Sequence, residues 1–425
     1  MPLEYAFEIA TAAIRYGFGV TREVGPELAD LGKSHVLVFA DPNLRNLPPL
    51  ATVQESLAEN KIRFSVFDRV HVEPTDESLH EATAAAQAGD YDAFVAVGGG
   101  STIDTAKAAN LYHCYPADLL DYVNPPVGKG KPVPGPLKPL IAIPTTAGTG
   151  SETTGVAIFD YVPMHAKTGI AHRRLKPTLG LIDPENTRTQ PPAVAASSGL
   201  DVLSHAIESY TALPFHQRPR PERPLLRPAY QGSNPISDVW SLESLRLLSL
   251  YLERAVRDPS DDEARANMML AAAFAGIGFG NAGVHLPHGM SYPVSGLVKS
   301  YRAPGYAVDH PLVPHGISVI LNGPAVYRFV SSACPERHLR AAEILGAKIS
   351  GARREDAGKI LADHVVQLMQ RLQLPNGLKA LGYRAPDIPK LVEGTLPQHR
   401  VTKLSPRPAG PDELARLFEE AMVAW

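Results

Sequence analysis

The chain has 425 residues, enough for two domains, and its 44% hydrophobic and 20% charged residues are ordinary for a globular protein. With 41 Lys and Arg against 44 Asp and Glu, the net charge of −3 excludes a strongly basic nucleic-acid binder. Two cysteines, Cys114 and Cys334, exclude a disulfide framework and a cysteine metal site, which suits a reducing compartment.

The apolar runs are too short to span a bilayer, so no membrane partner is expected. The first residues include Glu4 and Glu8 and lack the basic and apolar regions of a signal peptide or a convincing transit peptide. We therefore expect a cytoplasmic protein, with the mitochondrial matrix as the location only if a transit peptide has been removed.

The first part of the chain alternates short apolar runs with longer amphipathic or alanine-rich segments. The runs predict strands at 34–40, 63–67, 93–97, 140–143 and 179–182, and the segments predict helices at 49–60, 77–89 and 101–112. This alternation is typical of a mostly parallel sheet flanked by helices, and the 160–183 stretch also fits a hairpin.

After about residue 190 the strand signals nearly vanish. Helices are expected at 193–211, 235–257, 262–276, 338–345, 354–372 and 411–424. Two stretches rich in proline, 214–228 and 299–314, predict long loops. The expected organisation is an α/β domain at 1–190 and an all-α domain at 191–425.

A set of potential metal ligands lies in the second half of the chain. Asp201 and His205 are four residues apart in a helical pattern, so both side chains leave one face of one helix. His288 and His315 each stand between a proline and a glycine. One carboxylate and three imidazoles suit a divalent transition metal, either Fe²⁺ or Zn²⁺. The alternative is a helix carboxylate, a core histidine and two loop histidines. We call Asp201, His205, His288 and His315 the Asp/His₃ set.

Two segments that follow predicted strands are suited to a nucleotide. In the first, glycines let backbone N–H groups at a helix start approach a pyrophosphate; the second is dense in hydroxyl groups. A tight turn and a solvated loop are the alternatives, but two such loops at one sheet edge favour a nucleotide crevice. The candidate residues are Gly98, Gly99, Gly100, Ser101 and Asp104, and then Thr145, Thr146, Thr149 and Ser151.

Asp41 ends the first predicted strand, where a carboxylate can bond a ribose hydroxyl. An acid at that point would repel a 2′-phosphate, so NAD is favoured over NADP. An Asx turn before Pro42 is an equally good interpretation of Asp41.

Together these segments resemble the iron-containing (group III) alcohol dehydrogenases, whose fold is shared with dehydroquinate synthase and glycerol dehydrogenase. The matching segments extend over nearly the whole chain and include 98–104, 144–152, 181–184, 199–210, 234–238 and the two His-Gly pairs. The resemblance implies that the Asp/His₃ set binds the catalytic metal, that the glycine and threonine loops bind the dinucleotide, and that Lys167 lies near the nicotinamide ribose.

Within that family the chain is most similar to the hydroxyacid–oxoacid transhydrogenase branch, through the strings 230–235, 281–293, 308–316 and 394–403. Members of that branch transfer hydride from 4-hydroxybutyrate to 2-oxoglutarate through tightly bound NAD, giving succinate semialdehyde and 2-hydroxyglutarate. The resemblance implies a metal- and NAD-dependent oxidoreductase of small molecules, with Fe²⁺ as the metal and Zn²⁺ as the alternative, that forms a homo-oligomer.

Tyr292 departs from many relatives, which have a histidine at that place near the nicotinamide. Imidazole exchanges protons with solvent near neutral pH, whereas a tyrosine hydroxyl does so poorly. This fits a cycle in which the acceptor ketone takes back both the hydride and the proton that the donor alcohol loses. We therefore expect Tyr292 to be a catalytic residue.

Both substrates carry a carboxylate remote from the reacting carbon, which calls for arginine or lysine. The candidates stand in the two proline-rich loops: Arg218, Arg220, Arg223, Arg227, Lys299 and Arg302. Each could equally be a solvated loop charge. Glu208 could support a metal ligand, but a surface salt bridge is its expected role.

Three other functions stay open. The first is an NAD-dependent alcohol or hydroxyacid dehydrogenase whose cofactor exchanges freely. The second is a metal- and NAD-dependent lyase like dehydroquinate synthase, against which the strings around Tyr292 argue. The third is a non-catalytic NAD-binding protein, which the complete Asp/His₃ set disfavours.

Overall fold

The computed structural model describes residues 2–164 and 166–425. The chain divides into two compact units. An α/β unit contains Ala10–Pro191 and Pro259–Met269, and a helical unit contains Met1–Ile9, Pro192–Asp258 and Leu270–Trp425. The two fold classes agree with those predicted for the two halves of the chain.

The expected division into 1–190 and 191–425 differs from these units in two places. Near the N-terminus, the Glu4 carboxylate accepts from Arg227 at 3.0 Å, which holds the first residues in the helical unit. The 259–269 segment belongs to the α/β unit, where the Tyr16 hydroxyl donates to the carbonyl of Ala266 at 3.2 Å. These are contacts between residues far apart in sequence, which local patterns do not report.

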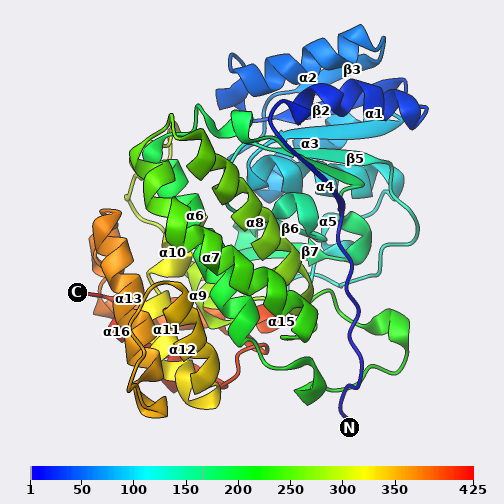
Figure 1. The fold of residues 1–425 in the computed structure, drawn as a ribbon. Coiled ribbons are helices and arrows are strands. Elements are labelled where there is room, and N and C mark those ends of the chain that lie inside the picture. The colour runs from blue at the N-terminus through cyan, green and yellow to red at the C-terminus, as the bar shows by residue number, and fades with distance from the viewer. Residues whose placement is uncertain (1, 165) are drawn as a thin grey trace. The chain divides into compact units, whose positions relative to one another are not determined.

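A six-stranded sheet forms the centre of the α/β unit (Figure 1). Its order is β1-β8-β5-β4-β2-β3, and every neighbouring pair is parallel. The strands are β1 (Ala13–Tyr16), β2 (His35–Ala40), β3 (Arg63–Phe67), β4 (Ala93–Gly98), β5 (Leu140–Pro144) and β8 (Leu179–Ile182). The hairpin expected within 160–183 is β6 (Val156–Tyr161) with β7 (Ala166–Ala171), which pair antiparallel.

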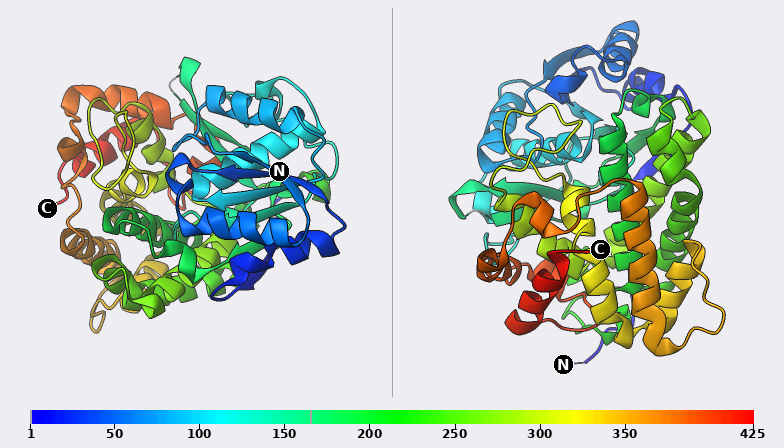
Figure 2. Two further views of the ribbon diagram at one scale, coloured as in Figure 1. Left: turned by 90° about the horizontal axis from the view of Figure 1, so that it is seen from above. Right: turned by 90° about the vertical axis from the view of Figure 1, so that its left-hand side faces the viewer.

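Helices cover both faces of this sheet (Figures 1 and 2). Side chains alternate along β2: Val36 and Val38 pack with α1 (Val24–Asp30) and α2 (Pro48–Glu59), whereas Leu37 and Phe39 pack with α3 (Asp76–Gln87) and α4 (Gly100–Cys114). A strand buried on both faces has no polar side, which explains its continuous apolar run. The short α5 (Leu119–Tyr122) completes the unit.

The helical unit is built around α6 (Pro192–Thr211), which packs against α7 (Pro235–Arg257) and α10 (His315–Ile320). Buried residues occupy most of α6, from Ala195 to Thr211, so the helix is a core element. The other helices of this unit are α9 (Leu286–Gly296), α11 (Gly323–Val330), α12 (Pro335–Ile344), α13 (Ala357–Arg371), α14 (Ile388–Thr395), α15 (His399–Thr402) and α16 (Pro411–Ala421). Helix α8 (Asp262–Ala282) belongs to the α/β unit up to Met269 and to the helical unit from Leu270.

Helices α9, α10 and α11 were not among the elements expected from sequence. Helix α9 contains Gly289 and Pro293, two residues of low helix propensity, and α10 has only six residues. Every residue from Leu286 to Val294 is buried, so tertiary packing rather than propensity stabilises α9.

In the described part of the chain no single helix has the length and hydropathy of a membrane span. Helices α8 and α9, which are bent by 104° relative to each other, meet these criteria only as a pair.

Candidate functional site

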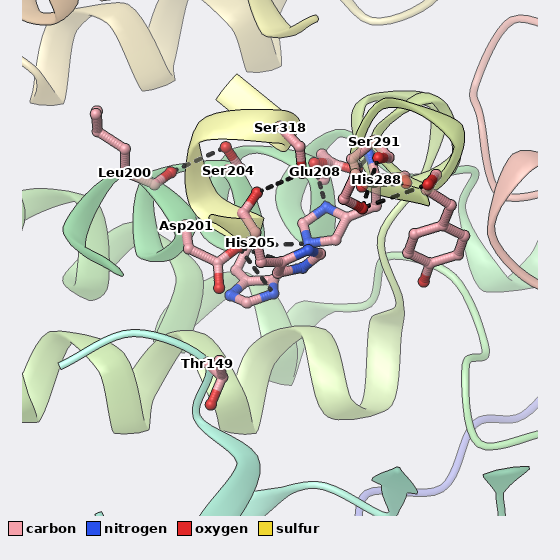
Figure 3. Close-up of polar contacts among 12 residues, drawn as sticks. Thr149, Leu200, Asp201, Ser204, His205, Glu208, His288, Ser291 and Ser318 are labelled. Carbon is pink, nitrogen blue, oxygen red and sulfur yellow. Dashed lines mark hydrogen bonds and ion pairs between the residues drawn. The ribbon is translucent and has the colours of Figure 1, made fainter. Parts of the chain in front are cut away.

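Three helices of the helical unit bring the Asp/His₃ set together (Figure 3). Asp201 and His205 lie one turn apart on α6, His288 lies in the first turn of α9, and His315 is the first residue of α10. The Nε2 atoms of the three histidines stand 3.7, 3.6 and 3.8 Å from Oδ1 of Asp201. One ligand atom from each residue lies within 4.8 Å of all the others.

The chemistry of this cluster fits a divalent cation. Asp201 Oδ1 and His288 Nε2 are buried without any hydrogen-bond partner, which is costly for polar atoms unless a ligand satisfies them. Ligand atoms that bind zinc tetrahedrally at about 2.1 Å are about 3.4 Å apart, close to the distances found here. One carboxylate oxygen and three imidazole nitrogens suit iron and zinc alike.

Glu208 orients the His288 ring through a hydrogen bond to Nδ1, the ring nitrogen that does not face Asp201. Its side chain is fully buried on α6, and Oε1 accepts from Nδ1 of His288 at 2.6 Å. Its Oε2 accepts from the backbone N–H of His285 at 2.7 Å. The expected surface salt bridge is therefore wrong, because this carboxylate faces the core and directs Nε2 of His288 toward Asp201.

The charges of the cluster are strongly coupled. Burial would raise the pKa of Asp201, but the neighbouring imidazoles hold it well below its ordinary value. Burial lowers the pKa of His205 to about 3, so this imidazole is neutral at pH 7, as a metal ligand must be. Burial would lower the pKa of His288 as well, but Glu208 and Asp201 raise it to about 10. A binding metal would have to displace that proton.

In the α/β unit, the predicted nucleotide loops follow β4 and β5, which are neighbours in the sheet. The loops touch: Thr145 N–H donates to the carbonyl of Gly98 at 3.0 Å. A Cβ on Gly100 would lie 2.6 Å from the Thr149 side chain, and one on Gly99 would lie 3.3 Å from Oγ1 of Thr146. A larger residue at either glycine would push the threonine loop away from the start of α4. The sequence pattern did not reveal this reason for the glycines.

Asp104 connects the two loops through its carboxylate. Oδ1 accepts from Ser151 Oγ at 2.5 Å and from Nζ of Lys107 at 3.3 Å, and Oδ2 accepts from the Ile158 N–H at 2.9 Å. Lys107 is fully buried and also donates to Ser151 Oγ at 2.6 Å and to the Val156 carbonyl at 2.8 Å. Sequence reasoning missed Lys107, because a lysine on the helix α4 is ordinarily solvated.

The other predicted nucleotide contacts have partners inside the α/β unit. Ser101 Oγ accepts from the Glu73 N–H at 3.1 Å. Asp41 Oδ1 accepts from the Asn43 N–H at 2.7 Å, which is the Asx turn that the sequence left as the alternative. Lys167 is buried and pairs with Glu73 at 2.6 Å and Asp160 at 3.1 Å. Its ribose contact stays a prediction.

The loop cations predicted to meet a substrate carboxylate mostly have partners in the protein. Arg227 pairs with Glu4, and Lys299 donates to both oxygens of Asp387 at 2.8 and 2.7 Å. Arg218 donates to the backbone carbonyl of Tyr230, and Arg302 donates to that of Asp309, both at 2.8 Å. The guanidinium of Arg220 lies over the ring of Tyr5, 4.3 Å from its centroid. Arg223 is exposed.

Tyr292 lies one turn after His288 on α9 and is buried. Its hydroxyl oxygen accepts a hydrogen bond of 2.8 Å from Nη2 of Arg400 on α15. Sequence reasoning singled out the 394–403 segment but not Arg400 as a site residue, since a periodic pattern does not show where a long side chain ends.

Family models match both halves of the chain. The model described as iron-containing alcohol dehydrogenase matches residues 11–184, and the model of the Fe-containing alcohol dehydrogenase family, C-terminal, matches residues 229–422. The chain belongs to the iron-containing alcohol dehydrogenase family. The family that its motifs resemble is thereby confirmed.

Curated relatives narrow this assignment. The chain is 62% identical over 424 residues to "Hydroxyacid-oxoacid transhydrogenase, mitochondrial" of Bos taurus, covering 99% of this chain and 91% of that protein. It is 60% identical to the Homo sapiens protein of the same name, with the same coverage, and 54% identical to a "probable" one of Dictyostelium discoideum, covering 99% and 80%. The chain is an oxidoreductase of the transhydrogenase branch.

Solved structures agree with the fold. "1,3-Propanediol oxidoreductase" matches with a TM-score of 0.86 at 27% identity, covering 98% of this chain and all of that one. Sulfoacetaldehyde reductase from Bifidobacterium kashiwanohense, in complex with NAD⁺, matches with a TM-score of 0.80 at 25% identity over 99% of both chains. The iron-containing alcohol dehydrogenase fold is therefore confirmed.

The expectation of a cytoplasmic protein is wrong. It depended on the acidic first residues, whereas the Bos taurus, Homo sapiens and Dictyostelium discoideum relatives are all named mitochondrial. Charge near the start of the chain was a poor indicator of the compartment.

Proposed function

We propose that this protein is a hydroxyacid–oxoacid transhydrogenase that couples oxidation of 4-hydroxybutyrate to reduction of 2-oxoglutarate. The products are succinate semialdehyde and 2-hydroxyglutarate, and NAD stays bound throughout. The observation that carries the proposal is the clustering of the Asp/His₃ set, three of whose members are buried, in a chain that is 62% identical over 424 residues to a protein with that name.

The Asp/His₃ set would hold a divalent metal, Fe²⁺ by family and Zn²⁺ as the alternative. Bound metal would polarise the substrate oxygen and bound NAD would carry the hydride. Glu208 keeps Nδ1 of His288 protonated and bonded, which leaves Nε2 as the ligand atom. The burial of Asp201 and His205 excludes water from the ligand atoms and strengthens their electrostatic interactions.

In the α/β unit, the glycine loop after β4 and the threonine loop after β5 would bind NAD. The support is their position at the carboxyl ends of neighbouring parallel strands, where nucleotides bind in open α/β sheets. The hydrogen bonds from Lys107 and Ser151 to Asp104, and from Lys107 to Ser151, hold the two loops together.

Tyr292 would help retain the proton during the cycle. The donor alcohol loses a hydride and a proton, and the acceptor ketone gains both, so no net proton enters solvent. The Tyr292 side chain is buried and its hydroxyl accepts from Arg400, and a phenol is in general a poorer proton relay than an imidazole.

The test is an incubation of metal-loaded protein with 4-hydroxybutyrate and 2-oxoglutarate, without added NAD. Mass spectrometry should find succinate semialdehyde and 2-hydroxyglutarate in equal amounts over many turnovers. Turnover only with added NAD, together with release of NADH, would instead identify a dehydrogenase with an exchangeable cofactor. That outcome would also remove the role given to Tyr292.

A further inference from the structure

Arg400 is a cation whose charge no carboxylate of the described residues balances. It lies in α15, and its guanidinium has two neighbours: Nη2 donates to the Tyr292 hydroxyl at 2.8 Å, and Cζ stands 5.0 Å from the centroid of the Tyr230 ring. Both neighbours are tyrosine side chains. The Nη1 atom is buried and has no hydrogen-bond partner.

A buried guanidinium without a counter-ion lowers the stability of the folded protein. Burying a charge without a counter-ion costs several kcal/mol, and an unsatisfied buried donor adds to that cost. Other partly buried arginines of the helical unit avoid it: Arg337 pairs with Asp238 at 2.8 Å, and Arg227 pairs with Glu4 at 3.0 Å. The unpaired donor of Arg400 therefore indicates an anionic ligand.

Two series of contacts connect Arg400 to the Asp/His₃ set. On one side, Tyr292 lies one helical turn from His288 on α9. On the other side, the ring of Tyr230 packs edge-on against Phe279 at 6.3 Å, and Phe279 stacks on the imidazole of His205 at 3.9 Å. The guanidinium is thus held on the same body of packed side chains as the metal ligands.

We propose that Arg400 binds the carboxylate of both substrates, with Tyr292 positioning its guanidinium. This inference rests on the proposed function, because it takes hydroxyacids and oxoacids as the substrates. Nη1 would donate to the carboxylate, giving a charge-assisted hydrogen bond while Nη2 stays on Tyr292. Arg400 then determines specificity for acids over neutral alcohols.

One arginine can serve both half-reactions because the two substrates share a spacing. In 4-hydroxybutyrate the reacting carbon is separated from the carboxylate by two methylene groups. In 2-oxoglutarate the reacting carbon is separated from the distal carboxylate by two methylene groups as well. A cation at one place can therefore hold the donor and the acceptor with their reacting carbons in the same position. Acids with one or three methylene groups should fit less well.

The test measures the donor half-reaction alone. Holoenzyme loaded with metal and NAD is mixed with excess donor and no acceptor, and formation of bound NADH is followed by absorbance. The donors are 4-hydroxybutyrate and 1-butanol, which differ in the carboxylate. We expect Arg400→Met to lower the second-order rate constant for 4-hydroxybutyrate about 100-fold and that for 1-butanol less than about threefold. Arg400→Lys should recover part of the loss.

The ratio of the two rate constants separates recognition from folding, because a smaller active fraction lowers both equally. Arg407 provides the matched control, since it lies over the ring of Phe329 at 4.0 Å and is exposed. Arg407→Met should leave the ratio unchanged. A wild-type ratio in Arg400→Met would overturn the inference, as would a carboxylate-specific loss that appears in Lys299→Met or Arg302→Met instead.

Binding of glutarate, measured by calorimetry on the same holoenzymes, distinguishes this inference from the proposed function. Glutarate has the carboxylates but no group to oxidise or reduce. We expect its Kd to rise about 100-fold in Arg400→Met. If wild-type protein makes no transhydrogenation products yet binds glutarate through Arg400, the proposed function fails and only the carboxylate-binding role of Arg400 stands. If products form but Arg400→Met binds glutarate like wild type, the inference alone fails.

Discussion

Glu208 controls the direction in which His288 presents its lone pair. The 2.6 Å bond from Nδ1 fixes the ring, and the same carboxylate accepts from the His285 N–H, so the start of α9 is tied to α6. A buried carboxylate in this position also raises the basicity of the imidazole. The metal affinity of the site should therefore depend on a residue that does not touch the metal.

Glu208→Gln is expected to weaken metal binding about 10- to 100-fold, because the amide keeps the shape but loses the charge that supports His288. Metal content after dialysis against graded chelator measures the effect. The matched control is Glu243→Gln on α7, where the carboxylate is exposed and pairs with Arg246. Equal metal retention in both variants would show that Glu208 has only a packing role.

At the scale of elements, α10 approaches α6 closely at Gly316. A Cβ on Gly316 would lie 1.9 Å from the carbonyl oxygen of Ser197 and 3.1 Å from Cβ of Asp201. Gly316 follows His315 directly, so this contact sets how near the third imidazole comes to the ligands on α6. The His-Gly pair in the sequence reflects this packing.

Gly316→Ala should push α10 away from α6. We expect a loss of about 2 to 4 kcal/mol in the free energy of unfolding, measured by urea denaturation, and weaker metal binding. Gly410→Ala is the control, because its Cβ would meet only the flexible end of Glu413 at 3.2 Å and should cost less than about 1 kcal/mol. If both alanine variants are equally stable, backbone shifts absorb the clash.

Helix α4 is attached to the threonine loop by a buried lysine. Lys107 satisfies Asp104, Ser151 and the Val156 carbonyl at once, and its side chain is inaccessible to solvent. Burial lowers the pKa of Lys107, and the Asp104 charge opposes that shift. The amine is thus part of the support for the two loops.

Lys107→Met is expected to destabilise the protein by about 3 kcal/mol, because it leaves the Asp104 carboxylate without its buried counter-ion. It should also weaken binding of NAD, measured by calorimetry. Lys129→Met is the control, since Lys129 is exposed where it pairs with Asp121 and should contribute less than about 1 kcal/mol. Unchanged stability of Lys107→Met would contradict this account.

At the scale of the whole molecule, the Asp/His₃ set joins segments from residues 201 to 315 of the helical unit. A metal that binds only the folded chain stabilises it by about 4 kcal/mol when its free concentration is a thousand times the Kd. Chelation should therefore lower the Tm of wild-type protein, as followed by circular dichroism. His315→Ala removes one ligand and should make the Tm nearly insensitive to chelator; an equal fall in that variant would indicate that the metal binds elsewhere.

Five of the six strands of the parallel sheet could be predicted within one or two residues, because the central strands are buried and continuously apolar. The edge strand β1 was not predicted, since its four residues are mostly exposed and form no apolar run. The long helices α6 and α7 were predictable for a similar reason, since each keeps an apolar face over many turns. The bounds of α9, α10 and α11 were not, because glycine and proline suppress the local signal and burial in the core overrides it.

What the sequence determined by itself is therefore which groups are present: four ligand residues, two loops after strands, and the elements that carry them. The tertiary structure alone decided which atoms meet. It placed Glu208 behind His288, gave most of the loop cations partners within the protein, and left Nη1 of Arg400 buried and unpaired. Local patterns depend on neighbours along the chain, whereas the partner of a long polar side chain depends on packing between residues far apart in sequence.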